Sequence, residues 1–270
     1  MKKFLSILAL SLIAISSFGW GRNGHDAIAY IADCNLTPKA KEAISYYLDG
    51  KSVVYYASWM DEMRHLEPYN GKLEGHSFAV DENLELRLLE NPVNDLPGGF
   101  DDGLYQYIKL VESLSGGKYK DMSKEDVAFA IKVIVHLVGD YHQPMHVRYL
   151  GVESSYRGYQ SVFVNFRGQK LRYHKFWDND SITGVHKWNF MEYGYVLGCL
   201  NEDQVKEITE GDIKDWCRET ARLCRPIHDW VKEGDNITNA LLYNMVVPLA
   251  ESQIQKAGYR LAKVLNEIFG

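Results

Sequence analysis

Histidine and aspartate side chains are concentrated in one apolar segment, IKVIVHLVGDYHQPMH, which spans residues 131–146. His136 and Asp140 are four residues apart, so a helix would place both on one face. An unpaired carboxylate in apolar surroundings is costly or gives up its charge. The pair can satisfy each other, meet a basic residue from elsewhere, or bind a divalent metal. Taken alone, such a pair favours the structural interpretation.

The same segment contains two further histidines. His142 lies about 240° further round the helix than His136, which predicts a structural or supporting role. Pro144 ends the helix and turns the chain. That turn can bring His146 back towards His136 and Asp140.

Candidate metal ligands recur in separated parts of the chain. His25 lies in WGRNGH, Asp61 in ASWMDEMR and His76 in EGHSF, and His174 and Asp178 are four residues apart in YHKFWD. All of these side chains offer nitrogen or carboxylate oxygen. That donor set suits zinc that performs hydrolysis, with a coordination position left open for water.

The N-terminus has the three-part pattern of an export signal. Lys2 and Lys3 precede an apolar stretch, residues 4–15, that is too short to span a membrane. Small residues at Ser17 and Gly19 predict cleavage after Gly19, which would make Trp20 the new N-terminus. The alternative is a buried N-terminal helix. We expect a signal peptide over residues 1–19 and a secreted or periplasmic protein.

The composition indicates one globular domain over residues 20–270. The chain has 270 residues, of which 46% are hydrophobic and 24% charged, with no repeat or linker. Apolar spacing and caps such as Thr37 and Ser123 predict helices in most periodic segments. The segment QSVFVNFRGQKLRYH, split by Arg167-Gly168, predicts a small β-hairpin. We expect a mainly α fold around a central buried helix, the one that carries His136, with this hairpin inserted. The expected helical ranges are 36–48, 52–66, 101–117, 122–144, 202–228 and 239–268.

Four cysteines raise the question of disulfides. An exported chain can oxidise them, so we expect disulfide bonds. Cys217 and Cys224 are seven residues apart in a segment expected to be helical, a rise of about 10 Å that is too long for a direct bridge. Each would therefore pair with Cys34 or Cys199.

The motifs, taken together and in order, resemble those of the zinc-dependent, single-strand-specific nucleases of the mung bean nuclease type. The matching motifs are WG-x-x-GH, ASW-x-D-x-x-R, H-x-x-GD-x-HQP-x-H and H-x-x-x-D, and the resemblance runs from Trp20 to the C-terminus. It implies a fold of the phospholipase C and nuclease type. It also implies an endonuclease that cleaves single-stranded DNA and RNA to 5′-phosphate products and removes 3′-phosphates from nucleotides.

The resemblance further implies three zinc ions. The first would be held by Asp61, His76, His136 and Asp140, and the second would share Asp140 and add His25 with the α-amino nitrogen and carbonyl oxygen of Trp20. The third would be held by His146, His174 and Asp178. Arg64 would contact phosphate, with Asp61 and Asp140 as the other catalytic residues. Base contacts would come from the segment 80–100. The stretch HSFAVDEN, which begins at His76 and runs into this segment, departs from the family pattern.

Net charge bears on the substrate. The formal charge is −6, and loss of Lys2 and Lys3 would take it to −8. Duplex binding usually requires a basic stripe, and none is visible. Zinc would place positive charge in the cleft itself, and aromatic side chains stack bases without reading their sequence. We therefore expect single-stranded DNA, RNA and 3′-nucleotides as partners, no membrane in the mature form, and a monomer.

Two alternatives remain. Zinc phospholipase C has a similar site and a mature chain beginning with Trp, but its last ligand is the glutamate of H-x-x-x-E, where this chain has Asp178. A secreted zinc-binding protein without activity would lack a ligand or Arg64, and neither is missing. His65, His186 and His228 match no motif, which predicts surface or structural roles.

Overall fold

Helices make up most of the chain in the computed structural model, which describes residues 19–70, 72–73, 75–88, 103–150 and 162–270. The apolar segment of the sequence forms α6 (Lys124–Asp140), with the Ser123 side chain accepting a hydrogen bond from the Asp126 backbone nitrogen as its cap. Its second half, from Val133 to Asp140, is buried without interruption. A helix that is apolar on all sides belongs in a core, so the expected central helix is confirmed.

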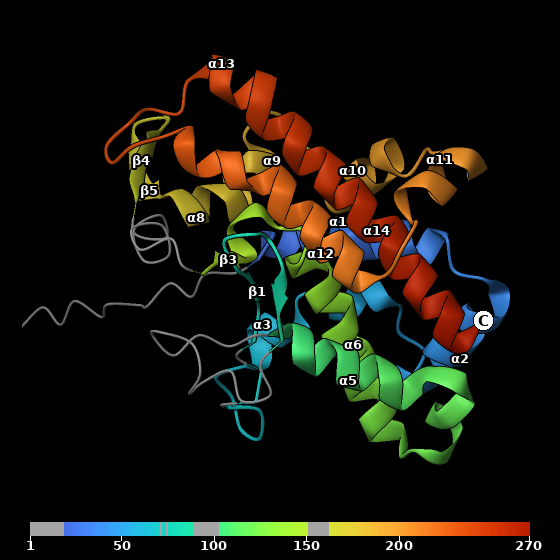
Figure 1. Cartoon of the computed structure of the whole chain (residues 1–270). Helices are drawn as coiled ribbons and strands as arrows, with labels where there is room; N and C mark the ends of the chain where they lie inside the picture. The colour runs from blue at the N-terminus through green and yellow to red at the C-terminus, as the bar shows by residue number, and fades with distance from the viewer. Residues whose placement is uncertain (1–18, 71, 74, 89–102, 151–161) are drawn as a thin grey trace, which may run out of the picture.

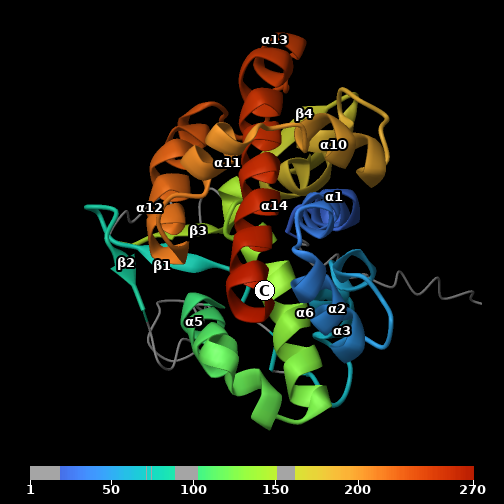
Figure 2. The same ribbon diagram turned by 90° about the vertical axis from the view of Figure 1, so that its right-hand side faces the viewer.

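Long helices surround α6. In Figure 1, α14 (Val247–Phe269) runs across the length of the molecule, and α12 (Ile213–Cys224) lies beside it. Gly258 lets α14 approach α1 (Gly21–Cys34) closely, because a Cβ at that position would lie 2.6 Å from Ile31. In Figure 2, α5 (Gly103–Leu114), α6 and α2 (Pro38–Tyr47) form the lower half of the molecule. The mainly α class is confirmed.

Shorter elements connect these helices. The remaining helical elements are η1 (Val53–Tyr56), α3 (Trp59–Met63), η2 (Ser115–Asp121), η3 (Pro144–His146), α8 (Tyr173–Lys175), η4 (Phe176–Asp180), α9 (Ser181–Thr183), α10 (Phe190–Leu197), α11 (Glu202–Ile208), η5 (Arg225–Asp229), α13 (Asn239–Leu241) and η6 (Leu242–Val246). The expected helix over 52–66 is thus two short pieces, η1 and α3. The helix expected over 101–117 ends at Leu114, before Gly116 and Gly117, whose φ values are positive.

The expected hairpin is confirmed, but it is not the only sheet among the described residues. Strands β4 (Phe163–Phe166) and β5 (Gln169–Arg172) pair antiparallel, and the positive φ angles of Arg167 and Gly168 give the turn that suits a two-residue hairpin. A second sheet has the order β2–β1–β3, with β1 (Phe78–Val80) parallel to β3 (Val147–Tyr149) and antiparallel to β2 (Leu86–Arg87). The sequence did not predict this sheet.

The expected disulfides are not formed. None of the four cysteines is joined in a disulfide: Cys34 and Cys199 are exposed, and Cys217 and Cys224 are buried in α12. The buried pair acts as small apolar side chains in the core, a common role for cysteine that requires no bonded partner.

Two expectations concern residues beyond the described ranges. Residues 1–18 of the signal peptide expected over 1–19 lie outside these ranges, as does much of the segment expected to contact bases, at 89–100. Within the described part of the chain, no helix has the length and apolar character needed to cross a membrane.

Candidate metal centre

The predicted ligand side chains converge from segments far apart in the sequence. His25 comes from α1, Asp61 from α3, and His136 and Asp140 from the last turns of α6. The others are His76, which precedes β1, His146 at the end of η3, His174 in α8 and Asp178 in the π-helical turn η4. All eight side chains are buried. Figure 1 shows α3, β1, β3 and α8 gathered on one side of the molecule.

Asp140 lies at the middle of the set. One of its carboxylate oxygens, Oδ2, lies 2.8 Å from His76 Nδ1 and 3.2 Å from His136 Nε2. The other oxygen, Oδ1, lies 3.4 Å from His25 Nε2 and 3.5 Å from His146 Nδ1. A single carboxylate therefore borders four histidines, which is the position required of a ligand that bridges two metal ions.

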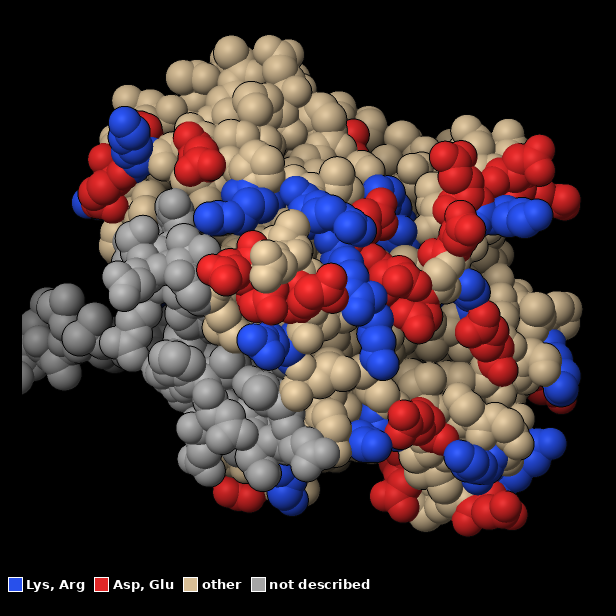
Figure 3. Space-filling model, in the orientation of Figure 1, with Lys and Arg blue, Asp and Glu red and all other residues tan. Residues whose placement is uncertain are grey.

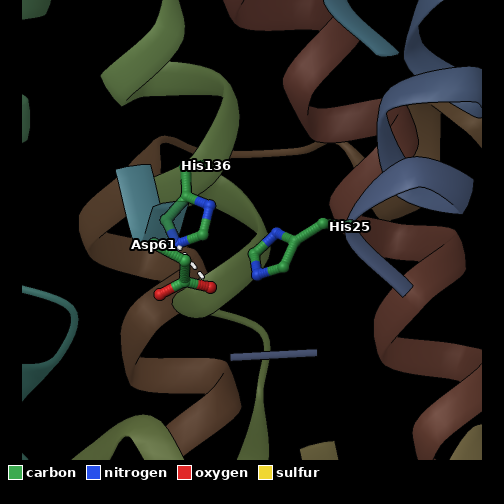
Figure 4. Close-up of side chains that lie close together, drawn as sticks. All are labelled: His25, Asp61 and His136. Atoms are coloured by element: carbon green, nitrogen blue, oxygen red, sulfur yellow. Dashed lines mark ion pairs between the residues drawn. The ribbon is translucent and has the colours of Figure 1, made fainter. Parts of the chain in front are cut away.

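Asp61 closes the same cluster from the opposite side. Its oxygens lie 3.7 Å from His76 Nδ1 and 3.7 Å from His136 Nε2. The His25 ring stacks on the His136 ring with centroids 4.1 Å apart. Figure 4 shows His25, Asp61 and His136 directed towards one another from three separate elements. The ligand atoms of these three lie within 4.8 Å of one another, as do those of His76, His136 and Asp140.

A further group lies beside this cluster. The ligand atoms of His146, His174 and Asp178 also lie within 4.8 Å of one another. His174 Nε2 is 3.5 Å from an Asp178 oxygen, and Gln143 Nε2 donates a hydrogen bond to the same oxygen at 2.5 Å. The structure thus groups these three residues as the resemblance implied.

Backbone carbonyl groups fix the orientation of three of the histidine rings. The His136 Nδ1 donates to Ala57 O at 2.8 Å, the His76 Nε2 to Leu73 O at 3.0 Å, and the His146 Nδ1 to the His76 carbonyl at 2.6 Å. With one ring nitrogen donating in this way, the other nitrogen is directed into the centre and is the one available to a metal ion. Metal-binding histidines in proteins are held in the same manner.

Several inward-facing polar atoms have no hydrogen-bond partner. These buried atoms are His25 Nε2, Asp61 Oδ1, Asp140 Oδ1, His146 Nε2 and His174 Nε2. Each such atom costs about 1–3 kcal/mol when it is left unsatisfied, and natural proteins rarely retain several together. Because all five belong to the predicted ligand set, a metal ion is the partner that fits them.

The pKa values of this centre favour the same chemistry. Burial lowers the pKa of His25, and it lowers the pKa of His146 to about 4, so both rings are neutral and able to bind a metal at neutral pH. Burial also opposes the charges of Asp140 and His136. The charge of His136 nevertheless holds the pKa of Asp140 well below its ordinary value. In turn, Asp140 and Asp61 raise the pKa of His136 to about 9. These carboxylates need positive charge beside them, and a divalent cation supplies it without protonating a ligand.

The backbone before α1 reaches the same cluster. A Cβ on Gly19 would lie 1.8 Å from Asp140 Oδ1 and 2.7 Å from His25 Nε2, so only glycine fits there. The Trp20 side chain is fully buried. The Trp20 nitrogen is two bonds from the Gly19 Cα, so the backbone that enters α1 passes close to this cluster.

The remaining predicted residues lie around this centre. Arg64, at the C-terminal end of α3, is half-buried and donates through Nε to His65. His142 is fully buried and hydrogen-bonded within the protein, in agreement with the structural role expected of it. His186 stacks on Trp188, and His228 packs against the Tyr149 ring, so neither belongs to the centre.

Two supporting residues were not predicted. Gln143 orients Asp178, and the only sign of it in the sequence is its place within the H-x-x-GD-x-HQP-x-H motif. Gly139 allows α6 to approach His25, because a Cβ there would lie 2.8 Å from His25 Nδ1. In both cases the requirement comes from a residue distant in the sequence.

Comparison with known proteins gives a consistent result. The S1/P1 Nuclease family model matches residues 20–270. Nuclease P1 of Penicillium citrinum is 25% identical over 93% of this chain and 98% of its own length. Nuclease S1 of Aspergillus oryzae is 22% identical over 99% of this chain and 98% of its own, and Endonuclease 2 of Arabidopsis thaliana is 24% identical over 93% and 91%. With the fold class and the expectation of a phosphodiester hydrolase thereby confirmed, the chain belongs to the S1/P1 nuclease family.

Proposed function

We propose that this chain is an exported, zinc-dependent endonuclease that cleaves single-stranded DNA and RNA to 5′-phosphate products and also removes 3′-phosphates from nucleotides. The observation that carries the proposal is the convergence of eight buried histidines and aspartates, with five inward-facing atoms that lack a hydrogen-bond partner. Family membership makes nucleic acid the substrate.

The donor set supports zinc as the metal. All eight side chains offer imidazole nitrogen or carboxylate oxygen, and sites of mixed nitrogen and oxygen donors suit catalytic zinc. The inner cluster provides more donor atoms than one tetrahedral ion requires; it consists of His25, Asp61, His76, His136 and Asp140. The outer group of His146, His174 and Asp178 provides three donors. Two ions around Asp140 and one at the outer group therefore account for the donors, with Trp20 completing the set.

Each part of the site has a task in phosphodiester hydrolysis. When bound, zinc ions neutralise the phosphate charge, lower the pKa of a bound water and stabilise the departing oxygen. Asp61 and Asp140 would hold the ions in place. One Asp61 oxygen would bind a metal ion, and the other would orient the attacking water and accept its proton. Arg64, three residues after Asp61, binds the substrate phosphate through its planar guanidinium.

The surface charge supports single strands over duplexes. Figure 3 shows Lys and Arg interspersed with Asp and Glu over the visible face, without a broad area of one sign. Duplex binding draws most of its affinity from many phosphate contacts. A chain of net charge −6 fits a substrate that enters the metal centre and is held there by a few contacts.

Export is part of the proposal because Trp20 needs a free amine to bind metal. Cleavage after Gly19 would remove the residue that now packs against Asp140 and would leave the Trp20 α-amino group in its place. A free α-amino group has a pKa near 8, so a metal can displace its proton at neutral pH.

The test uses protein that begins at Trp20. Zinc per chain is measured first, and cleavage of single-stranded DNA, RNA, duplex DNA, a 3′-nucleotide and phosphatidylcholine is then assayed with and without a chelator. We expect about three zinc ions per chain and chelator-sensitive cleavage of single strands, in line with metal-assisted hydrolysis.

Other outcomes would change the proposal. Lipid cleavage without nucleic-acid cleavage would select the phospholipase C alternative. Stoichiometric zinc without any hydrolysis would indicate a zinc-binding protein that has lost activity. Absence of bound metal would make His136 and Asp140 a structural pair.

A further inference from the structure

A groove of about 300 Å³ lies where α2, α3 and α6 meet, away from the metal ligands. These three elements are neighbours, as Figure 2 shows. We call this feature the α6 groove. Its lining residues are Tyr47, Asp49, Trp59, Tyr69, Lys124, Glu125, Ala128, Phe129 and Lys132. None of them belongs to the proposed ligand set, and the volume is that of a small-molecule site.

The groove and a predicted metal ligand lie on the same face of α6. Phe129, Lys132 and His136 are separated by three and four residues, the spacing that aligns side chains on one side of a helix. Phe129 is about 10 Å from His136 along the helix axis. On the opposite wall, Trp59 precedes Asp61 by two residues in α3. A flexible chain bound at the metal centre can therefore extend into the groove.

The groove presents partly exposed aromatic rings. The Trp59 ring meets the Tyr69 ring at 4.9 Å and the Phe129 ring at 6.0 Å, both nearly at right angles. The Tyr69 and Phe129 rings are almost parallel, with an interplanar angle of 14°. All three are only half-buried. Rings packed against one another hold a fixed orientation, so their open surface forms a rigid platform for another flat ring.

The groove also carries a positive charge at its inner end. Lys132 Nζ lies 4.4 Å from the Tyr56 ring and 5.0 Å from the Trp59 ring, and it makes no ion pair with any described carboxylate. Burial lowers the pKa of Lys132, so an anion beside it would stabilise its charge. At the outer rim, by contrast, Lys124 pairs with Asp49 at 2.5 Å, and Glu125 is exposed.

We propose that the α6 groove binds one nucleotide of a single-stranded substrate beyond the two that flank the scissile bond. The base would stack on the platform of Trp59, Tyr69 and Phe129, and a phosphate would bind Lys132. This combination of aromatic rings and a cation is how proteins hold single strands without reading their sequence. A cationic ligand, such as a choline headgroup, is disfavoured because the Lys132 ammonium group, which lines the groove, would repel it. The inference rests on the proposed nuclease function and names a site beyond the reacting centre.

The test compares substrates of two lengths with the zinc-loaded protein that begins at Trp20. A dinucleoside monophosphate has only the two nucleosides that flank the scissile bond, whereas an oligothymidylate of about ten nucleotides reaches the groove. For the longer substrate we expect Tyr69→Ala to lower kcat/KM about tenfold, the loss expected of one stacked base. Dinucleotide cleavage should be unchanged, and Tyr69→Phe should restore the rate because it keeps the ring.

Lys132→Gln provides an independent measurement. It should lower kcat/KM for the longer strand and reduce the slope of log kcat/KM against log salt concentration by about 0.7, the value for one lost phosphate contact with a single strand. The matched control is Lys51→Gln, because Lys51 also lies over a tyrosine ring, that of Tyr55 at 5.0 Å, but outside the groove. The control should change neither the rate nor the salt slope.

Three results would overturn the groove while leaving the nuclease intact. They are equal losses on both substrates, which indicate a structural effect; unchanged cleavage of the longer strand by both variants; and wild-type protein that cleaves both lengths with the same kcat/KM. Failure of the wild-type protein to cleave any nucleic acid is a separate outcome. It would overturn the proposed function and the groove with it.

Discussion

The end of α6 carries two fully buried histidines, and their surroundings differ in one respect. His142 has both ring nitrogens bonded by the protein: Nδ1 donates to Val138 O at 2.8 Å, and Nε2 accepts from Arg260 at 2.9 Å. His136 Nδ1 donates to Ala57 O, but no described residue outside the predicted ligand set bonds its Nε2. Its Nε2 faces Asp140, Asp61 and another histidine nitrogen.

The neighbours of the two histidines extend this difference. On the His142 side, Gln253 donates to the His142 carbonyl and to Thr220, and Arg260 pairs with Glu219, so α14 and α12 are tied to the end of α6. On the His136 side, backbone carbonyl groups hold three rings at one nitrogen each, but five inward-facing atoms of the ligand set lack partners. Buried polar groups that the protein itself satisfies support the fold, whereas buried groups that await a partner indicate a binding site.

Among the variants that test this difference, Asp140→Asn should have the largest effect on metal content and activity. An amide cannot bridge two cations as a carboxylate does, so we expect loss of bound metal and a fall in kcat/KM of at least about 100-fold. Metal content and single-strand cleavage are measured on the same preparation. Asp203→Asn, an exposed change in α11, is the control for a lost aspartate. Full zinc and full activity in Asp140→Asn would exclude the bridging role.

The variants His136→Gln and His142→Gln compare the metal-binding role of one histidine with the structural role of the other. We expect His136→Gln to weaken metal binding by about 10–100-fold, because one ligand is lost. His142→Gln should retain the metal but lower the melting temperature, since a buried hydrogen bond to Arg260 is altered. Zinc titration and thermal unfolding of both variants test this. Equal metal loss in the two variants would mean that the two sides are not separate.

Spacing in the sequence predicted two pairs of side chains that lie together, whereas the rest of the ligand set came from the resemblance to the nuclease family. His136 and Asp140, and likewise His174 and Asp178, share a helical face whatever the rest of the chain does. A long apolar helix also has few places to lie other than the core, so the position of α6 followed from its composition. Thr37 and Ser123 cap their helices as expected, through hydrogen bonds to Ala40 N and Asp126 N.

The arrangement of the set could not be predicted in the same way. The sheet that aligns His76 with His146 is built from strands of two or three residues and a parallel pairing of Phe78 with Val147. Pairings this short and this distant in sequence leave no periodic signal. The close approaches at Gly19 and Gly139 depend likewise on where His25 lies, which is fixed only by the packing of α1.

An N-terminal extension tests the part of the centre that lies outside α6. Adding Ser-Gly before Trp20 to the protein that begins there would block the α-amino group and put glycine back where Gly19 packs against Asp140. We expect one zinc site to weaken by about tenfold, the usual scale for loss of one contact in a metal site. Unchanged zinc content and rate would remove Trp20 from the ligand set. The melting temperature in chelator should not change, because the His142 side does not involve the N-terminus.

Glu219→Gln has the smallest expected effect and reports only on the His142 side. Burial opposes the Glu219 charge, but hydrogen bonds from Lys256 and Arg260 outweigh it and hold the pKa of Glu219 below its ordinary value of 4.5. A carboxyl group with a lower pKa in the folded state stabilises the fold above its unfolded pKa, and this contribution is lost as the pH falls through the folded pKa.

The free-energy difference between wild type and Glu219→Gln should therefore be about 1 kcal/mol near neutral pH and should shrink as the pH falls below about 4.5. Urea unfolding at a series of pH values, on zinc-free protein of both kinds, measures this difference and cancels the other titrating groups. A difference that stays constant down to acid pH would show that the ion pair with Arg260 contributes nothing. In that case the other hydrogen bonds around His142 would hold α12 and α14 to the end of α6 without help from this ion pair.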